Sequence, residues 1–309
     1  MSNDSDSLVV IIVNWNSYRL VAQTIRSLFE HNAHLRLECF VVDNNSTNTE
    51  GKNDVLDLIG GNNLVENKAN VGFGNANNQI MQQNQGKDFL ILNPDTIQDS
   101  DAVSKAWQIL KNDKTIGVVG IRHIDHSSGE TQDSAFLSVT PWFQVLNILR
   151  LGTLIYKKIK VDQSKNLDVD WVVGSFMLVR GAVFDEVGGF DPSFFLNNED
   201  IEWCSRIRNK GWRIRYLGDY SMRHIGGGTR HFMADSTLTF ARSHLHYLWK
   251  TSAYLPALTY YVLMCWVFFA SATRDLFLKK FRNSDSIQVK KKFQRFQDFL
   301  LLKSVESCI

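Results

Sequence analysis

Cysteine is scarce in this chain of 309 residues. The four cysteines, Cys39, Cys204, Cys265 and Cys308, form no C-x-x-C pair. Cys39 also lies within an apolar run that is typical of a strand. We therefore expect reduced thiols and a protein exposed to the cytosol.

Several sequence motifs of nucleotide and hydrolase sites are absent as well. The chain has no G-x-x-x-x-G-K-[ST] phosphate loop and no G-x-S-x-G nucleophile elbow. Residues 72–77 begin as G-x-G, but the third glycine position is Asn77. This stretch also follows the third predicted strand, whereas a dinucleotide fingerprint follows the first. These differences argue against NAD.

The excess of positive charge lies in one part of the chain. Residues 274–295 hold eight Lys or Arg against two Asp, a local charge of +6, so the net charge of +2 leaves −4 on the remainder. A general nucleic-acid-binding surface is therefore not expected. The first apolar run, residues 8–13, is short and follows the acidic Asp4 and Asp6, so it does not resemble a signal peptide.

The first 120 residues alternate between apolar runs and helix-length segments. Strands are expected at residues 8–13, 37–42, 63–65, 89–92 and 116–120, and amphipathic helices at 17–31 and 101–111. This alternation predicts an α/β fold with a mostly parallel sheet flanked by helices. Ligands of such sheets bind beyond the carboxyl ends of the strands.

Polar residues and glycines follow each of the first four predicted strands. In chain order they are Asn14 and Asn16, then Asp43, then Asn70 and Gly72, and finally Asn93 and Asp95. Helix capping explains any one of them, and Asp95 after Pro94 could simply cap the next helix. Four polar strand ends at one edge of a sheet favour a binding site.

A second polar cluster lies in the other half of the chain. The spacing of Ile201, Cys204 and Ile207 predicts a helix from about Asp200 to Gly211, which places Glu199 and Asp200 at its N-terminus. Capping is again the alternative explanation. Residues 171–179 read as a buried strand, and residues 212–217 and 220–224 as two short strands. His224 on its own would more often be structural than a ligand.

Seven motifs occur in an order that resembles a known family. They are Val13-Asn14-Trp15-Asn16, Asp43-Asn44-Asn45-Ser46, Glu66-Asn67-Lys68-Ala69-Asn70-Val71-Gly72-Phe73-Gly74, Leu92-Asn93-Pro94-Asp95-Thr96, Gly189-Phe190-Asp191, Asn198-Glu199-Asp200 and Arg223-His224. Together they resemble the inverting GT-A glycosyltransferases of family 2, most of all the rhamnosyltransferase branch that builds bacterial O-antigen and other surface polysaccharides. The resemblance covers residues 8 to about 230. It implies a Rossmann-like GT-A domain at residues 1–235 and a helical appendage at residues 236–309.

The resemblance also implies a nucleotide-sugar donor, dTDP-L-rhamnose or otherwise a UDP-hexose. The donor would lie over Asn14, Asn16, Asp43, Asn70, Gly72, Asn93 and Asp95, with Asp43 on the nucleoside. Asn93-Pro94-Asp95 occupies the D-x-D position, so one carboxylate of the usual pair is replaced by an amide. Asp95 would bind Mg²⁺ or Mn²⁺ on the diphosphate, with His224 as a further ligand.

The Glu-Asp pair resembles the catalytic motif of the family. Asp200 would be the base that removes the proton of the acceptor hydroxyl, and Glu199, Trp171 and Gly174 would contact the acceptor. A glycan carried on a polyprenyl diphosphate is the expected acceptor. Two other functions remain open, namely a sugar-nucleotide-binding module without turnover and a membrane scaffold.

Residues 251–273 contain no charged side chain. The segment is long enough to cross a bilayer core of about 30 Å. A single crossing would carry the basic tail outside, against the positive-inside tendency. An interfacial or re-entrant helix pair on the cytoplasmic face of the bacterial inner membrane is therefore expected. A true span and a soluble interface, such as a homodimer contact, remain alternatives.

Overall fold

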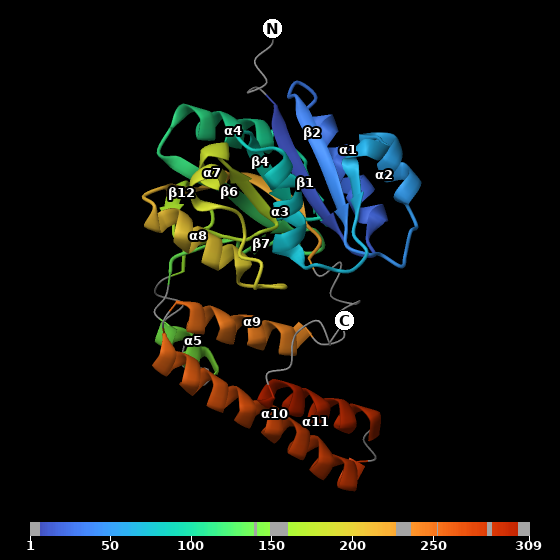
Figure 1. The fold of residues 1–309 in the computed structure, drawn as a ribbon, viewed down its shortest axis with the longest axis vertical. Coiled ribbons are helices and arrows are strands. Elements are labelled where there is room, and N and C mark those ends of the chain that lie inside the picture. Colours follow the sequence, from blue (N-terminus) through green and yellow to red (C-terminus); the bar gives the residue numbers. More distant parts are fainter. Residues whose placement is uncertain are drawn as a thin grey trace. The chain divides into compact units, whose positions relative to one another are not determined.

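The computed structural model describes residues 7–138, 141–148, 160–226, 236–251, 253–282 and 286–301, and these residues form two compact units (Figure 1). The first unit contains an α/β sheet and its helices. Its elements are β1 (Leu8–Asn14), α1 (Tyr18–His31), β2 (Leu37–Asp43), α2 (Lys52–Ile59), a 3₁₀ turn (Gly61–Asn63), β3 (Leu64–Glu66), α3 (Phe73–Gln83), β4 (Asp88–Leu92), β5 (Thr96–Ile97), α4 (Ala102–Asn112), β6 (Ile116–Asp125), β7 (Thr131–Gln132), β8 (Ala135–Phe136), β9 (Leu167–Val169), β10 (Trp171–Val172), β11 (Phe176–Val179), α7 (Gly181–Val187), α8 (Glu199–Asn209) and β12 (Arg213–His224).

The main sheet has the strand order β3-β2-β1-β4-β11-β6-β12-β5. The first four strands in this order are parallel, and β12 is parallel to β6. β11 is antiparallel to both of its neighbours, β4 and β6. Asn14 lies opposite Asp43 in the register, so the polar ends of β1 and β2 are side by side.

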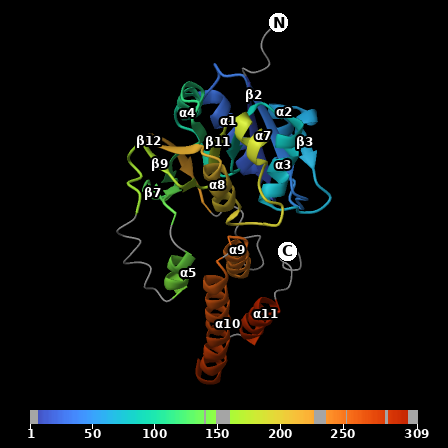
Figure 2. The ribbon, with the colours of Figure 1, turned by 60° about the vertical axis from the view of Figure 1, so that its left-hand side comes forward.

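Helices cover both faces of this sheet (Figures 1 and 2). All seven residues of β1 are buried, and successive residues point into different cores. Leu8 and Val10 pack with α1, α2 and α4, whereas Val9 and Ile11 pack with α3, α7 and α8. Continuous apolar runs are expected for strands that are covered on both faces. This burial explains why the strands were recognisable in the sequence.

The first four predicted strands and the two predicted helices are confirmed, with ends that shift by one residue or two. The single buried strand predicted at residues 171–179 was wrong. The chain forms β10 and β11 in separate sheets, with a turn at residues 173–175 between them. The two short strands predicted at residues 212–217 and 220–224 are one strand, β12, with an irregular register between Leu217 and Ser221.

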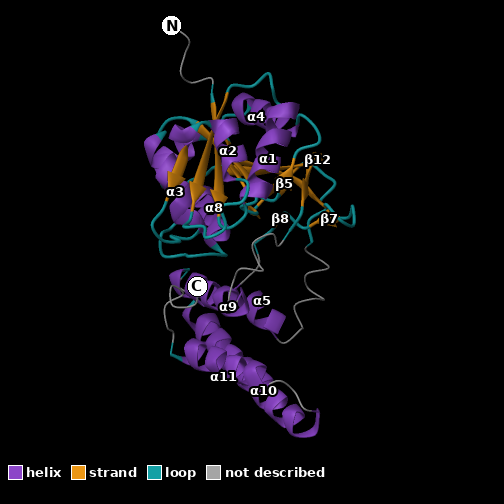
Figure 3. Cartoon of the chain, turned by 90° about the vertical axis from the view of Figure 1, so that its right-hand side faces the viewer, coloured by secondary structure: helices purple, strands orange, loops and turns teal. Residues whose placement is uncertain are grey.

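The second unit is helical and is described by itself. It contains α5 (Pro141–Ile148), α9 (Ser236–Lys250), α10 (Tyr254–Arg282) and α11 (Ser286–Leu300), together with residues 196–198. Its core consists of apolar side chains from all four helices. The helices are the purple elements labelled α5, α9, α10 and α11 in Figure 3.

The apolar segment of residues 251–273 lies almost entirely in one continuous helix, α10, so it is not itself a pair of short helices. Pro256 is the third residue of α10. In a first turn the missing amide hydrogen is tolerated, because no intrahelical acceptor is available there. The helix that pairs with α10 is α11.

No disulfide joins Cys39, Cys204 and Cys265, and Cys308 lies outside the described residues. Burial raises the pKa of the Cys39 and Cys204 thiols to about 12. Both thiols are therefore protonated and unreactive core residues.

Candidate active site

The polar ends of β1 and β2 are joined by side-chain hydrogen bonds. Asn14, which is fully buried, donates from Nδ2 to Asp43 Oδ1 at 2.6 Å. The backbone amide of Ser46 donates to the other carboxylate oxygen of Asp43 at 3.0 Å. Asp43 is only 4% exposed, and these donors compensate for the loss of water around its carboxylate. Asn14 thus holds the Asp43 carboxylate in place. A direct contact between Asn14 and a nucleotide-sugar donor stays a prediction.

Asn16 joins the loops that follow the same two strands. Its backbone is left-handed, with φ of 57°, and its Oδ1 accepts hydrogen bonds from the amides of Thr47 and Asn48, both at 2.8 Å. Asparagine tolerates this conformation better than most residues. Asn16 therefore shapes the loop that the donor would meet.

The turn before α3 brings a third strand end to this edge. Asn70 Oδ1 accepts a hydrogen bond from the Gly72 amide at 3.0 Å, and Asn44 donates to the Gly72 carbonyl at 3.1 Å. Gly72 has φ of 85°, and a Cβ at this position would lie 2.3 Å from the Phe195 carbonyl oxygen. Only glycine fits here, because the chain is both left-handed and in close backbone contact.

Asp95 does not cap a helix. It lies in the turn between β4 and β5, whereas α4 begins at Ala102 after Asp101 as its N-terminal flanking residue. Asn93 is the other polar residue of this turn. Its backbone amide donates a hydrogen bond to the Ser175 carbonyl oxygen at 3.1 Å. The capping explanation for Asp95 is therefore wrong, and another reason is needed for this buried charge.

Strand pairing brings His224 to Asp95. His224 in β12 lies opposite Thr96 in β5, and its Nε2 is 3.3 Å from Asp95 Oδ1. The other ring nitrogen, Nδ1, is 2.8 Å from Gln132 Oε1. Gln132 donates from its amide nitrogen to Asp125, so its oxygen faces the ring and Nδ1 must carry the hydrogen. In the neutral imidazole, Nε2 then presents a lone pair on the side of Asp95.

These groups fit a divalent cation that also binds a diphosphate. Mg²⁺ and Mn²⁺ prefer oxygen ligands and tolerate an imidazole nitrogen, and a hydrogen-bonded second nitrogen is the usual support of a ligating histidine. Asp95 is 6% exposed, so its carboxylate is largely shielded from water. Among the described residues, no group of three or more His, Cys, Asp or Glu side chains could hold a metal alone. Phosphate oxygens and water would supply the remaining ligands.

His123 is a member of this cluster that the sequence analysis missed. Its ring centroid lies 5.5 Å from that of His224, and its Nδ1 is 3.3 Å from Ser175 Oγ. Burial, and secondarily the nearby His224 ring, hold the pKa of His123 well below its usual value, so the His123 ring is neutral. The predicted strand ended at Gly120, whereas β6 continues to Asp125. That extension carries His123 to the site.

The Glu-Asp pair lies at the start of α8, which begins at Glu199. Asp200 accepts a hydrogen bond from the Gly174 amide at 3.1 Å through Oδ2, and one from the Ile201 amide at 2.9 Å through Oδ1. Burial raises the pKa of Asp200, while these amides oppose the shift. The bond to Gly174 reaches beyond the helix, so Asp200 is not only a local cap.

Glu199 is buried, with 5% exposure, and its Oε2 has no hydrogen-bond partner. Burial and the neighbouring Asp200 charge raise the pKa of Glu199 to about 8. Two adjacent carboxyl groups, one buried and one partly buried, cannot both ionise easily. We therefore place the proton of this pair on Glu199, because the two backbone amides that donate to Asp200 favour the charged form of Asp200.

Two consecutive residues lie between Asp200 and the pair formed by Asp95 and His224, which we call the Asp95 corner. The Gly174 amide binds Asp200, and the next residue, Ser175, accepts from Asn93 and contacts His123. Because neighbouring Cα atoms are about 3.8 Å apart, Asp200 and the turn that contains Asp95 are both hydrogen-bonded to one short stretch of backbone, and that they form one site stays a prediction. The turn at residues 173–175, which replaced the predicted continuous strand, makes this connection.

Trp171 lies in β10, where its ring stacks on Phe136 at a centroid distance of 4.1 Å. The Trp171 side chain is partly exposed. Its predicted contact with an acceptor stays a prediction.

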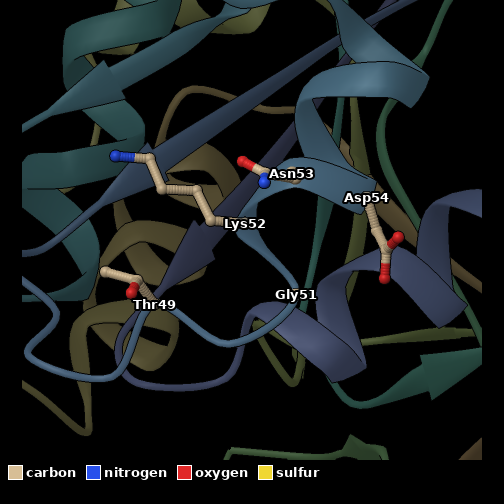
Figure 4. Close-up of a pocket in the computed structure, with 5 residues that line it drawn as sticks. All are labelled: Thr49, Gly51, Lys52, Asn53 and Asp54. Atoms are coloured by element: carbon tan, nitrogen blue, oxygen red, sulfur yellow. The ribbon is translucent and has the colours of Figure 1, made fainter.

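A hollow of about 400 Å³ lies elsewhere on the first unit. Its lining residues are Thr49, Gly51, Lys52, Asn53 and Asp54, which lie on the loop into α2 and on the first turn of that helix (Figure 4). Lys52 pairs with Glu66 at 2.6 Å. None of the predicted site residues lines this hollow, so we do not assign it to the chemistry.

Comparison with known proteins decides the family. The family described as "Glycosyl transferase family 2" matches residues 9–188, which is more than half of the chain. The chain belongs to glycosyltransferase family 2. The matched residues include the polar ends of β1, β2 and β4, and the Gly174–Ser175 turn.

Individual relatives of this family 2 glycosyltransferase are rhamnosyltransferases. "Rhamnosyltransferase WbbL" of Escherichia coli is 37% identical over 26% of this chain and 31% of its own length. "N-acetylglucosaminyl-diphospho-decaprenol L-rhamnosyltransferase" of Mycobacterium tuberculosis is 33% identical over 23% of each chain. "O-antigen chain rhamnosyltransferase WbaN" of Salmonella anatum is 25% identical over 63% of this chain and 59% of its own. The alignments to the first two relatives thus span less than a third of those proteins.

Solved structures of GT-A glycosyltransferases share the fold. GalNAc-T7 with UDP, GalNAc and Mn²⁺ superimposes with a TM-score of 0.56 and 15% identity, over 78% of this chain and 47% of its own. The mannosyltransferase PcManGT of Pyrobaculum calidifontis, in complex with GDP-Man and Mn²⁺, has a TM-score of 0.53 and 16% identity, over 96% of this chain and 88% of its own. The predicted fold class, GT-A with a mostly parallel sheet flanked by helices, is confirmed.

Proposed function

We propose that this glycosyltransferase moves L-rhamnose, with inversion, from dTDP-L-rhamnose to a hydroxyl group of a lipid-linked glycan. The names of three relatives support rhamnose, and one of them names a diphospho-decaprenol acceptor. A polyprenyl-diphosphate-linked glycan of bacterial surface polysaccharide synthesis has that chemistry. A UDP-hexose donor is the alternative, because the same fold binds UDP in GalNAc-T7.

The observation that carries the proposal is the pair of contacts made by Gly174 and Ser175. They connect the carboxylate of Asp200 with the Asp95 and His224 corner. An inverting transfer needs a base on one side of the anomeric carbon and a bound leaving group on the other. Asp200 would supply the base, and Asp95 and His224 would hold the leaving group. The turn at residues 173–175 contacts both Asp200 and Asn93, which is close to Asp95 in the chain.

Each part has a defined role in the reaction. Asp43, supported by Asn14 and Ser46, would contact the nucleoside, and Asn93 and Asp95 would face the diphosphate. Asp95 and His224 would hold a Mg²⁺ or Mn²⁺ ion, which neutralises charge on the diphosphate when bound. Asn70 and Gly72 shape the turn that borders the donor.

Asp200 takes the proton as the acceptor oxygen attacks the anomeric carbon. The new bond forms on the face opposite the diphosphate, the bond from the anomeric carbon to the diphosphate breaks, and its electrons leave with the phosphate. Burial makes Asp200 more basic than an exposed aspartate, which favours this step. Glu199 stays protonated beside it and can donate a hydrogen bond to the acceptor or to Asp200. Trp171 in β10 and Gly174 in the turn that follows would contact the acceptor.

A thermal-shift panel tests this function. The full chain is heated with dTDP-, UDP- and GDP-sugars, each with and without Mn²⁺. At a ligand concentration one hundred times its dissociation constant, linkage stabilises the fold by about 2.7 kcal/mol. We expect the largest shift with dTDP-L-rhamnose and Mn²⁺. A larger shift with a UDP-hexose would favour the alternative donor, and no shift with any nucleotide sugar would rule out the transferase and leave only a scaffold role.

A further inference from the structure

Helix α10 is apolar on two faces, and only one of them is packed. Ala257, Tyr260, Met264, Phe268 and Ala272 form the buried face within the helical unit. Another face is exposed and consists of Leu255, Leu258, Val262 and Trp266, which we call the α10 stripe. These four side chains are between 52% and 66% exposed. Their spacing of three and four residues places them on one side of the helix.

The other helices of this unit leave the α10 stripe uncovered. Helix α11 packs beside α10, with Phe268 against Phe299 at a centroid distance of 5.2 Å and Tyr261 Oη donating to the Leu300 carbonyl at 2.9 Å. The same unit contains further exposed aromatic residues, Trp249 and Tyr254. Four large exposed apolar side chains in one row indicate an interaction surface.

The packing of α11 decides against a simple membrane span. Residues 254–274 have a mean hydropathy of 1.6 and are long enough to cross a bilayer, but a third of this stretch is buried by protein. The helix that packs on its middle turns carries Arg295 and Asp298, and Lys290, Lys291 and Lys292 lie about one turn before Arg295. A spanning α10 would pull these charges toward the hydrocarbon, which costs several kcal/mol for each charge.

We infer that the α10 stripe inserts into one leaflet of an anionic membrane, with the helix axis in the plane of the interface. Leu258 and Val262 would enter the acyl boundary, and the amphipathic ring of Trp266 suits the headgroup depth. Lys290 and Lys291 of α11 are exposed and would attract anionic headgroups. The local charge of +6 at residues 274–295 adds to this attraction.

Charge also argues against a second copy of the chain on the same surface. Two copies joined through α10 would bring two basic stretches near each other, and like charges repel. An anionic lipid surface neutralises the same charge. This inference does not depend on the proposed reaction, although a lipid-linked acceptor would lie at the same surface.

Vesicle binding of the full chain tests the inference without any measurement of activity. The protein is sedimented with sealed vesicles of phosphatidylcholine, with or without 30% phosphatidylglycerol. We expect binding to the anionic vesicles that Leu258→Glu weakens at least tenfold, because a charge cannot enter the acyl boundary. Leu137→Glu is the matched control, since Leu137 in the first unit is 42% exposed and Leu258 is 52% exposed. The control should change binding less than twofold.

Two further arms separate charge from apolar burial. The double variant Lys290→Glu, Lys291→Glu should lose the preference for anionic vesicles. High salt should weaken binding of the parent protein only in part, because salt screens charges but not apolar burial. Circular dichroism of each variant, measured at the temperature of the vesicle experiment, checks that its helices remain folded.

Three outcomes would overturn the inference. Equal binding of Leu258→Glu and Leu137→Glu would show that the α10 stripe does not enter the lipid. Absence of vesicle binding, together with a dimer in sedimentation velocity that Leu258→Glu dissociates, would assign the surface to a second copy. If trypsin added outside the vesicles cuts bound protein elsewhere but not at residues 290–292, while trypsin trapped inside does cut there, α10 spans the membrane.

Discussion

His224 Nε2 lies 3.3 Å from Asp95 Oδ1, although most of the α/β unit separates these residues in the chain. The antiparallel pairing of β5 with β12 brings them together. The Ile225 amide also donates to the Asp95 carbonyl at 2.9 Å, which holds the two backbones in place. One corner of the site is therefore built by sheet pairing.

Replacing His224 tests this corner as a metal site. His224→Ala should weaken Mn²⁺ binding in the presence of dTDP by roughly ten- to a hundredfold, because one of two protein ligands is lost. Mn²⁺ titration followed by electron paramagnetic resonance measures the affinity. His126→Ala is the matched control, since His126 is exposed and bonds to the His224 carbonyl only through its backbone. Unchanged affinity in His224→Ala would assign the ring a purely structural role.

Replacing Asp200 tests the base. Asp200→Asn keeps an oxygen that can accept the Gly174 hydrogen bond, so the fold and donor binding should remain. Transfer should fall by about 10² to 10⁴, the usual contribution of a positioned base. Single-turnover transfer and nucleotide-sugar titration measure the two properties separately, with the exposed Asp185→Asn as control.

Asp95→Ala should show the opposite pattern from Asp200→Asn, with weaker donor and metal binding. Equal loss of donor binding in both variants would mean that the two roles are misassigned. Full transfer by Asp200→Asn would favour another base. Donor binding without transfer in the parent protein would favour a binding module.

Glu199 makes the stability of the first unit depend on pH. Its pKa rises from 4.5 in the unfolded chain to about 8 in the folded protein. Between these two pH values the folded protein keeps a proton that the unfolded chain releases. This contribution to stability is complete below pH 4.5 and is lost as the pH rises toward 8. Glu199→Gln should therefore have a higher free energy of unfolding than the parent at pH 8, and the difference should shrink toward pH 4.5. Urea unfolding at several pH values measures it.

Glu202→Gln is the matched control for that experiment. Glu202 is also 5% exposed and lies on α8, but it pairs with Arg206 at 2.8 Å. Its replacement leaves Arg206 without this carboxylate and should destabilise the protein at pH 8. If Glu199→Gln also destabilises at pH 8, the buried carboxyl is charged and our assignment of its proton is wrong.

Gly72 is expected to tolerate no side chain. Gly72→Ala adds a Cβ at φ of 85° and 2.3 Å from the Phe195 carbonyl, so the turn before α3 must move. We expect a cost of about 1 to 3 kcal/mol for backbone strain and more for the overlap, together with weaker donor binding. Gly129→Ala is the control, because Gly129 has φ of 73° and open space around it. If Gly72→Ala and Gly129→Ala lower the melting temperature equally, the positive φ alone accounts for the loss and the contact with Phe195 does not contribute.

Much of this fold was predictable because its signals are local. β1 and β4 are covered on both faces, so their sequences are continuous apolar runs, and the polar residues after them mark the strand ends. Asp43 and Asp95 were predicted as site residues from their positions after strands, whereas the role of Asp200 was implied by the resemblance of the Glu-Asp pair to the family motif. Parallel strands necessarily bring their carboxyl ends to one edge, which is why several of these residues lie near one another.

Other features could not be predicted because they depend on distant pairings. The apolar run at residues 171–179 looked like one strand, yet residues 173–175 turn so that Gly174 reaches Asp200 and Ser175 reaches Asn93. His123 and Gln132 carry no motif of their own. They join the site because β6 extends past its expected end and β7 pairs with it.

The sequence by itself determined the α/β class, the family motifs, the strand ends and the existence of a long uncharged segment, because local polarity and spacing encode all of these. Only the tertiary structure decided which strand pairing brings His224 to Asp95, that Glu199 is buried beside Asp200, and which face of α10 is packed. These last features depend on which elements meet across the chain. Hydrogen-bond pairing and burial decide that, and neither is a property of any one segment.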